Sequence, residues 1–339
     1  MLNQNLKLNT KLFDADPLSG EASVVKETTR KGFGEGLVIA AGQNKNVVGL
    51  CADLNESTQM NLFAKKYPER FVQVGVAEQN LVTAASGMAA MGKIPFAASY
   101  AIFSPGRNWE QIRTTIALND RPVKIVGSHA GISVGPDGVT HQALEDIALM
   151  RVLPNMIVLS PCDAIEAKKA TIEAAKINKP VYIRLARDKT PIITTEETPF
   201  EIGKAQIFFA PPMTPQVGII ATGPLIYNAI MAAQNFAQKG ISVKVLNICS
   251  IRPLDFEAVI NLAKEAGAIV SVEDHQVVGG LGSAIAEVLV QNYPVPMELI
   301  GVHDKYGQSG TPAELMEYYG MGVSSIEKAV ERVMGRKTT

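Results

Sequence analysis

The sequence predicts an α/β protein with two domains, each built on a mostly parallel sheet between helices. Apolar strand-like runs alternate with helix-like segments along most of the chain, which is typical of parallel sheets covered on both faces. The alternation gives way to Thr, Pro and Glu at 190–215, which predicts a linker. At 339 residues the chain is also too long for one ordinary core. We therefore expect an N-terminal tail at 1–20, a first domain at 21–189 and a smaller second domain at 216–335.

The individual elements follow from short apolar runs bounded by Gly, Pro, Asn or Asp, and from apolar residues that recur at helical spacing. Strands are expected in the first domain at 47–51, 71–74, 94–98, 123–127, 156–160 and 181–185, and in the second at 217–221, 243–248, 268–272 and 297–302. Helices are expected from Glu78 onward and at 109–118, 141–150, 164–175, 224–238 and 281–292.

The composition argues against several classes of function. A hydrophobic share of 47% with 19% charged residues predicts extensive buried surface, part of it in a subunit interface. A net charge of -1 gives no reason to expect nucleic acid or an anionic membrane as a partner. The N-terminus lacks a signal-peptide core and no apolar run is long enough to span a bilayer, so a soluble cytoplasmic protein is expected. Cys51, Cys162 and Cys249 are far apart, in or beside apolar runs, which predicts packing rather than a disulfide or metal cluster.

Glu78 stands where a short apolar strand ends and a helix begins. Gly75 breaks the strand, and the apolar residues after Glu78 recur at helical spacing. This position lies at the carboxyl end of a strand, where open α/β sheets place ligand groups. A carboxylate that only complements the helix dipole would give the same pattern, and spacing alone favours that structural interpretation.

A polar, glycine-rich loop at 127–142 carries His129, Asp137 and His141. Ordering such a loop costs conformational entropy, so we expect it to hold a ligand. A turn at Asp137 and a helix N-cap at Thr140 are the structural alternatives.

Other candidate residues carry no signal by themselves. Tyr100 and Phe103 offer aromatic faces near a loop, although an aromatic cluster is more often part of a core. Arg30, Ser57 and Arg187 each fall near the end of an expected element, as does His129, where they are otherwise solvated or capping residues.

Several motifs together resemble the transketolase family. They are Asp-Leu-Asn-Glu-Ser at 53–57, Val-Gly-Val-Ala-Glu-Gln at 74–79, the segment 95–103, Asp-Gly-Val-Thr-His-Gln at 137–142, Pro-Asn-Met at 154–156, Pro-Cys-Asp at 161–163 and Leu-Ala-Arg at 185–187. Their order and spacing match the family from about residue 30 to the C-terminus. The resemblance implies a thiamine-diphosphate-fold pyrimidine-binding (Pyr) domain followed by a transketolase C-terminal domain. The family's diphosphate-binding segment, with its Gly-Asp-Gly motif, has no counterpart here, because Pro136 precedes Asp137 and Gly138.

The resemblance also implies roles for the candidate residues. Glu78 would bond the N1′ atom of the aminopyrimidine of thiamine diphosphate and perform acid–base chemistry through the cofactor. Tyr100 and Phe103 would flank the pyrimidine. His141 would transfer protons near the reacting carbonyl, and Asp137 would bond the adjacent sugar hydroxyl.

The substrate's terminal phosphate is implied to lie against Arg30, Ser57, His129 and Arg187. The chain departs from many transketolases at Pro105 and Gly106, where a third aromatic is common, and at Pro136 and Val139, where Glu and Pro are common. These last two departures leave the donor and acceptor sugars open.

The implied function is that of the C-terminal catalytic subunit of a two-chain transketolase of the pentose phosphate pathway. It would transfer a two-carbon ketol unit between ketose and aldose phosphates with an N-terminal subunit that holds the diphosphate and most of the Mg2+ coordination. A heterotetramer is expected, with self-association through the Pyr and C-terminal domains. The alternatives are a β subunit of a 2-oxo acid dehydrogenase, a deoxyxylulose-phosphate-synthase-like chain, and a catalytically silent binding subunit.

The second domain contains one further motif, Glu-Asp-His at 273–275 followed by Gly-Gly-Leu-Gly at 279–282. A glycine-rich turn that opens a helix can receive an anion on its backbone amides. Close packing of helix on strand explains the glycines as well, and we expect an interface role in which His275 forms a domain contact.

Overall fold

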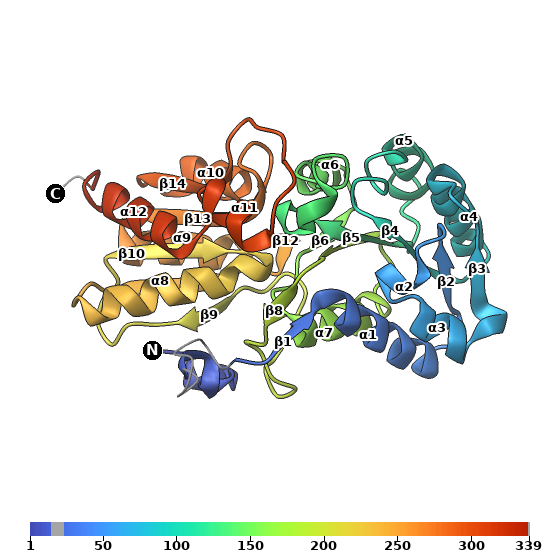
Figure 1. Cartoon of the computed structure of the whole chain (residues 1–339), viewed down its shortest axis with the longest axis horizontal. Helices are drawn as coiled ribbons and strands as arrows, with labels where there is room; N and C mark the ends of the chain where they lie inside the picture. Colours follow the sequence, from blue (N-terminus) through green and yellow to red (C-terminus); the bar gives the residue numbers. More distant parts are fainter. Residues whose placement is uncertain (15–23, 338–339) are drawn as a thin grey trace.

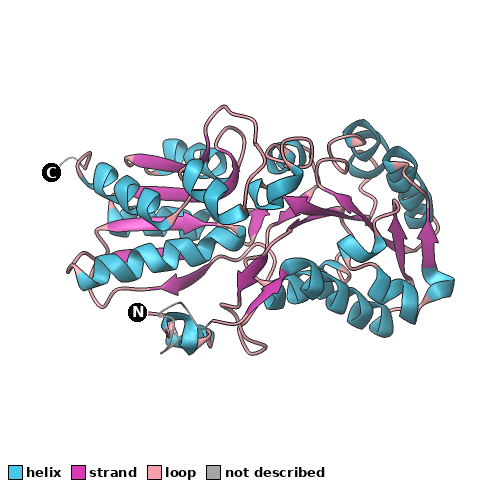
Figure 2. Ribbon diagram, viewed as in Figure 1, coloured by secondary structure: helices cyan, strands magenta, loops and turns pink. Residues whose placement is uncertain are grey.

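The computed structural model describes residues 1–14 and 24–337 and confirms an α/β fold with two large sheets and a separate two-stranded one (Figures 1 and 2). Residues 15–23, which include the end of the expected tail and the start of the expected first domain, lie outside the described residues. The two sheets lie in the two halves of the elongated molecule, and helices cover both faces of each (Figure 2).

The first sheet has seven strands, and its edge strand β12 comes from the second half of the chain. The order is β12 (Ser250–Arg252), β6 (Ile157–Leu159), β7 (Val181–Ala186), β5 (Lys124–Ala130), β4 (Ile94–Tyr100), β2 (Val47–Cys51) and β3 (Phe71–Gln73). All neighbouring pairs are parallel except β12 with β6. The central strands β2, β5 and β7 are buried along their whole length, as strands covered on both faces must be.

Two groups of helices cover this sheet. Those on one face are α1 (Thr29–Gln43), α3 (Asn61–Lys66) and α7 (Ala164–Ala174), which pack with Phe33, Phe63 and Phe96 in one buried cluster. Those on the other face are α4 (Glu78–Ala90), α5 (Trp109–Gln111) with the π-helix η4 (Ile112–Ala117), and α6 (Asp146–Arg151). A short helix, α2 (Asn55–Thr58), follows β2.

The helix expected at 141–150 begins only at Asp146, so that prediction is wrong in its first half. Its earlier residues instead pair with the C-terminal end of β5, because Ala143 forms a parallel bridge with Ala130 and its carbonyl oxygen accepts from the Gly131 N–H at 2.8 Å. The N-cap position belongs to Glu145 and not to Thr140.

The second sheet has five strands, and only its edge strand β9 is antiparallel. The order is β14 (Met297–Val302), β13 (Ile269–Gln276), β10 (Val217–Ala221), β11 (Val243–Asn247) and β9 (Gln206–Phe209). Helices α8 (Ile226–Gln238) and α12 (Val323–Met334) cover one face, and α9 (Phe256–Ala266) and α10 (Leu281–Asn292) the other. Helix α11 (Pro312–Tyr318) starts with a capping box between Thr311 and Glu314.

The segment expected as a linker, 190–215, carries secondary structure. Strand β8 (Lys189–Pro191) pairs antiparallel with β1 (Lys26–Thr28), and β9 belongs to the second sheet. The N-terminal residues also have a fixed place, because Leu8 and Leu12 are buried in the core of the second domain and the Asn3 N–H donates to the Phe208 carbonyl at 3.0 Å.

A buried polar cluster joins the two domains beneath the strand ends. The Arg184 guanidinium on β7 donates to the Asp146 carboxylate at 2.8 Å and to the Asp274 carbonyl of β13 at 2.7 Å. Burial opposes the charge of Arg184, but Asp146 and Asp274 raise the pKa of its guanidinium. Nε2 of His275 accepts from the Ala148 N–H at 3.4 Å, so the expected domain contact of His275 is present.

The contact of α1 with α7 supplies a test of the packing. A Cβ on Gly32 would lie 1.8 Å from the Ala164 carbonyl oxygen, so Gly32→Ala must push the two helices apart. We expect a loss of about 1–3 kcal/mol in the free energy of unfolding, measured by urea denaturation. Gly87→Ala on α4 is the matched control: its Cβ meets nothing within 4 Å, so a gain of about 0.5–1 kcal/mol is expected. Equal effects of the two substitutions would contradict this account.

Candidate active site

The carboxylate of Glu78 lies in the first turn of α4, directly after β3, and is only 3% exposed. Its Oε2 accepts a hydrogen bond from the Arg107 guanidinium at 3.2 Å, and its carbonyl oxygen accepts from Asn108 Nδ2 at 2.8 Å. The loop after β4 therefore holds both the backbone and the side chain of Glu78. Sequence reasoning did not identify Arg107, because an exposed arginine next to a Pro-Gly turn has no distinguishing pattern.

An aromatic layer lies beside this carboxylate. Tyr100 ends β4 and stacks on Phe103 with the ring centroids 5.9 Å apart. The Arg107 guanidinium lies 4.9 Å from the Phe103 centroid, so Arg107 connects the aromatic layer with Glu78. His129 stacks on Tyr100 at 3.8 Å, and His141 meets the Phe103 ring edge-on at 5.5 Å. The structure thus brings both histidines to the aromatic residues that the sequence analysis named.

His129 is held as a neutral imidazole. It lies in β5 with φ of 54°, and its Nδ1 is 2.9 Å from the Ser128 hydroxyl. Burial, followed by the positive charges of Arg30 and Arg187, lowers the pKa of His129 to about 3. At neutral pH its ring can therefore bond a ligand but adds no positive charge.

Two arginines lie near enough to His129 for their charges to act on it. The Arg30 guanidinium at the start of α1 donates to the carbonyl oxygens of Ser57 and Arg187, the latter at 2.7 Å. Arg187, just after β7, donates to the Val134 carbonyl at 2.9 Å. These bonds place Arg30, Ser57 and Arg187 together, and the charges of both arginines act on His129.

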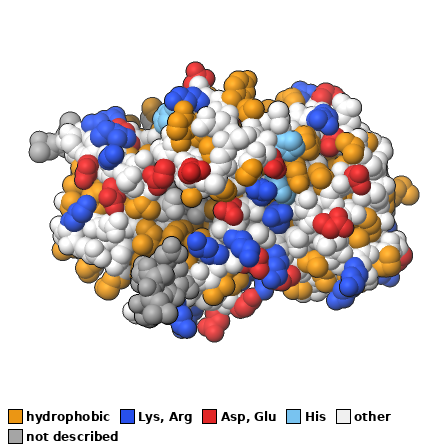
Figure 3. All heavy atoms as spheres, in the orientation of Figure 1, with side chains coloured by type: hydrophobic (Ala, Val, Ile, Leu, Met, Phe, Trp, Pro, Cys, Tyr) orange, Lys and Arg blue, Asp and Glu red, His pale blue; other side chains and the backbone are white. Residues whose placement is uncertain are grey.

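Asp137 is the candidate that these contacts do not reach. It is exposed at the end of the 3-10 turn η5 (Ile132–Asp137). Within the described residues, no hydrogen bond or ring contact joins its side chain to the other candidates. It shares the loop with His141, whose N–H donates to the Gly138 carbonyl at 3.0 Å. On the face seen in Figure 3, Lys and Arg side chains gather with His near the middle of the molecule, where α1, β5 and β8 lie in Figure 1.

The glycine-rich turn of the second domain is filled by the protein itself. The buried Glu273 carboxylate accepts from the Leu281 N–H at 2.6 Å and the Gly282 N–H at 2.8 Å. Burial raises the pKa of Glu273 to about 7, although both bonds lower it. An external anion would have to displace this side chain, so the turn has a structural role within the second domain.

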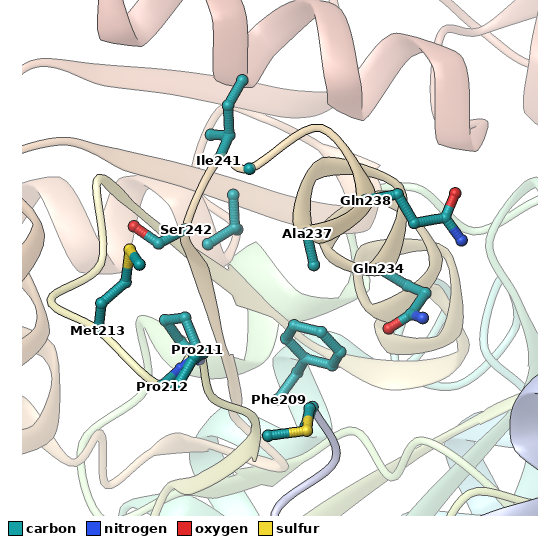
Figure 4. Close-up of a pocket in the computed structure, with 12 residues that line it drawn as sticks. Phe209, Pro211, Pro212, Met213, Gln234, Ala237, Gln238, Ile241 and Ser242 are labelled. Carbon is teal, nitrogen blue, oxygen red and sulfur yellow. The ribbon is translucent and has the colours of Figure 1, made fainter.

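An apolar cavity of about 360 Å³ lies elsewhere on the second domain, between the end of α8 and the segment after β9 (Figure 4). Phe209, Pro211, Met213 and Ile241 are among its lining residues, and none of the candidate site residues lines it.

In the part of the chain that the structure describes, no group of three or more His, Cys, Asp or Glu side chains is placed to hold a metal ion. No described helix combines the length and apolar character needed to cross a bilayer.

The depressed pKa of His129 predicts a pH effect on stability. The unfolded chain binds a proton at His129 below pH 6.5, whereas the folded chain resists it down to about pH 3. The contribution of His129 is therefore fully present above pH 6.5 and is lost as the pH falls through this window. In urea unfolding between pH 7 and 4 we expect His129→Gln to flatten the fall in stability, with the exposed His303→Gln as control. An unchanged slope in His129→Gln would contradict the neutral imidazole.

Comparison with known proteins gives the family. The sequence matches the transketolase pyrimidine-binding domain at residues 26–192 and the transketolase C-terminal domain at 211–326. A protein of Methanocaldococcus jannaschii named as a transketolase C-terminal section is 43% identical, over 93% of this chain and 99% of that protein. A 6-deoxy-6-sulfo-D-fructose transketolase subunit of Clostridium sp. is 38% identical, over 88% of this chain and 91% of that protein.

A solved structure supports the same assignment over most of the chain. It is described as a split gene transketolase, inactive beta4 tetramer, and it matches with a TM-score of 0.85 at 41% identity. The match covers 92% of this chain and 99% of that chain. The chain therefore belongs to the transketolase family and carries its Pyr and C-terminal domains.

Proposed function

We propose that this chain is the C-terminal catalytic subunit of a thiamine-diphosphate-dependent transketolase. Together with an N-terminal subunit it moves a two-carbon ketol unit from a ketose phosphate to an aldose phosphate. The observation that supports this most is the set of contacts from the buried Glu78 carboxylate through Arg107 and the aromatic layer to His129, where the charges of Arg30 and Arg187 act on the imidazole. A carboxylate, flat apolar faces and two cations in sequence suit a cofactor ring at one end and a sugar with an anionic terminus at the other.

The residues fit the pyrimidine half of thiamine diphosphate. A buried carboxylate beside stacked rings is the donor set that an aminopyrimidine requires, since its ring nitrogen needs a proton partner and its faces need apolar contact. When bound, the cofactor supplies the nucleophilic carbon that carries the two-carbon unit. Glu78 would hold and release a proton at its carboxylate, while Tyr100 and Phe103 would fix the ring and exclude water.

His141 and Asp137 would act on the sugar. His141 lies edge-on to Phe103, so it would stand beside the reacting carbonyl and exchange a proton there. Asp137 would bond the neighbouring hydroxyl and select its configuration. His129, neutral by its lowered pKa, would contribute a hydrogen bond to the substrate.

Arg30 and Arg187, with Ser57, would bind the terminal anion of the sugar. Charge-assisted bonds of this kind contribute roughly 1.5–3 kcal/mol each. The Clostridium relative is named for a sulfonated sugar, so the same two cations suit a sulfonate as well as a phosphate. We infer that the substrates are sugar phosphates of the pentose phosphate pathway in the cytoplasm. A sulfonated sugar should be assayed as an alternative substrate in the same experiments.

An N-terminal subunit would hold the diphosphate and Mg2+. The matched domains are the Pyr and C-terminal ones, and the related beta4 tetramer is described as inactive, which supports the need for a second kind of chain. We propose a heterotetramer that self-associates through the Pyr and C-terminal domains.

Purification from the native cells tests the proposal. The partner is identified by sequencing whatever co-purifies, and ketol transfer is assayed for the chain alone and for the complex, with thiamine diphosphate and Mg2+. A stoichiometric partner with a Gly-Asp-Gly motif and sugar-phosphate activity only in the complex is the expected result. Activity on pyruvate or another 2-oxo acid instead would overturn it.

Glu78→Gln tests the proton chemistry. The glutamine amide has nearly the shape of the carboxylate. Even if the bond from Arg107 is lost, the loop should stay folded, because Asn108 still donates to the backbone carbonyl of residue 78. We expect kcat for ketol transfer to fall by about 100- to 10,000-fold. Glu110→Gln, exposed two residues beyond Asn108, should leave kcat unchanged. A Glu78→Gln complex with wild-type kcat would exclude Glu78 as the acid–base group.

Arg187→Ala tests the binding of the terminal anion. We expect KM for the sugar phosphate to rise by about 10- to 100-fold while kcat changes much less, because the lost bond is made equally in the ground and transition states. Arg113→Ala, exposed on η4, is the control for loss of a positive charge. An unchanged KM would contradict the assignment of Arg187.

A further inference from the structure

We propose that the second domain positions the substrate loop, residues 131–142, through Gln142, which makes Gln142 a positioning residue for His141 and Asp137. The inference rests on the proposed function, since it concerns the same site. The partner of the loop is the segment 303–311 between β14 and α11, here called the clamp segment. Figure 1 shows this connection next to α6, at the junction of the two halves.

Gln142 links the two segments directly. Its side chain is only 3% exposed, and its Nε2 donates to the Gln308 carbonyl of the clamp segment at 3.0 Å. The same nitrogen is 3.3 Å from the Ile132 carbonyl and 3.5 Å from the Gly135 carbonyl, both in the substrate loop. One amide nitrogen thus ties both arms of the loop to the other domain, next to the proposed catalytic His141.

The backbone of the substrate loop packs against the second domain along its length. At its start, the Ile132 N–H donates to the Asp274 carboxylate at 2.9 Å. Near its middle and end, Cβ atoms on Gly135 and Gly138 would lie 3.2 Å from the Gly310 carbonyl oxygen and 2.6 Å from the Ser309 hydroxyl. Asp137 and His141 belong to the same loop, so the position of their side chains depends on the docking.

The clamp segment is itself fixed to the second domain. Gln276 of β13 donates to the Lys305 carbonyl at 2.7 Å and accepts from the Asp304 N–H at 3.2 Å. The Tyr319 hydroxyl donates to the Tyr306 carbonyl at 2.8 Å. The position of a loop held by this segment therefore depends on the second sheet as well as on its own strand β5.

Gly307 is the steric counterpart of Gln142. A Cβ on Gly307 would lie 1.8 Å from Gln142 Oε1, so even alanine must displace the amide. Gln142 and Gly307 are thus expected to be coupled energetically, because a side chain at position 307 would weaken the docking by displacing the Gln142 amide.

The role predicts a kinetic signature opposite to that of Arg187→Ala. The residues that the loop positions would act on the reacting carbons, whereas the terminal anion would bind to Arg30 and Arg187, of which only Arg187 bonds the loop within the described part of the chain, through the Val134 carbonyl. A displacement of about 1 Å at reacting groups can cost on the order of a hundredfold in rate. Gln142→Leu, which keeps bulk but removes the N–H donors, is expected to lower kcat by about tenfold or more with little change in KM.

The docking is tested without any activity, on the full chain and on its complex with the co-purified partner. In Gln142→Leu we expect amide hydrogen exchange in 131–142 and tryptic cleavage after the exposed Lys305 to accelerate by about tenfold. Gly335→Ala, whose Cβ would have no contact shorter than 3.6 Å, should change neither rate. Acceleration in the substrate loop alone, or in neither segment, would overturn the proposal.

If single variants lose stability, a double-mutant cycle still separates the coupling between Gln142 and Gly307 from the effect of each substitution alone. Gly307→Ala should accelerate cleavage after Lys305 and lower kcat by about tenfold in the wild-type background. In a Gln142→Ala background the effect should be less than about twofold, because the amide is gone and the next atom, Ile132 Cδ1, lies 3.0 Å from the new Cβ. Equal effects in both backgrounds would refute the coupling. If the wild-type complex shows no ketol transfer, the proposed function fails, while the exchange and cleavage arms still decide the docking.

Discussion

The buried guanidinium of Arg184 is the interaction on which the arrangement of the molecule depends. It extends from a central strand of the first sheet, bonds Asp146 at the start of α6 and reaches the backbone of β13 in the second domain. A charge taken out of water is stable only when its partners are fixed, and removal of one partner from such a pair costs several kcal/mol. The ion pair of Arg184 and Asp146 therefore fixes the positions of the strand ends, α6 and the second domain relative to one another. The candidate site is built on these elements.

The site divides its work between rigid and adjustable parts. Glu78, Tyr100 and His129 come from the ends of elements in the first domain, where buried strands leave little freedom. The loop that carries Asp137 and His141 has only short turns of its own and takes its shape from both domains. Such a division would allow a preorganised cofactor end and a substrate end whose shape depends on both domains.

Sequence reasoning succeeded where a local pattern determines the structure. The α/β alternation and the start of α4 at Glu78 follow from apolar spacing and a glycine break, and both are present. The helix expected from His141 failed because the backbone of Ala143 is recruited by β5, a tertiary contact that spacing does not encode. Arg107 and Gln142 were missed for a related reason: their importance lies in partners 29 and 166 residues away.

The strand β12 has a consequence for how the chain can be divided. It is encoded after the second domain has begun, yet it completes the outer edge of the first sheet beside β6. A polypeptide that stopped at the end of the matched Pyr region would leave the outer backbone groups of β6 unpaired, while β7 still pairs with its inner side. The second half of the chain thus covers a strand edge of the first half, and a cut between the two domains would expose that edge to solvent.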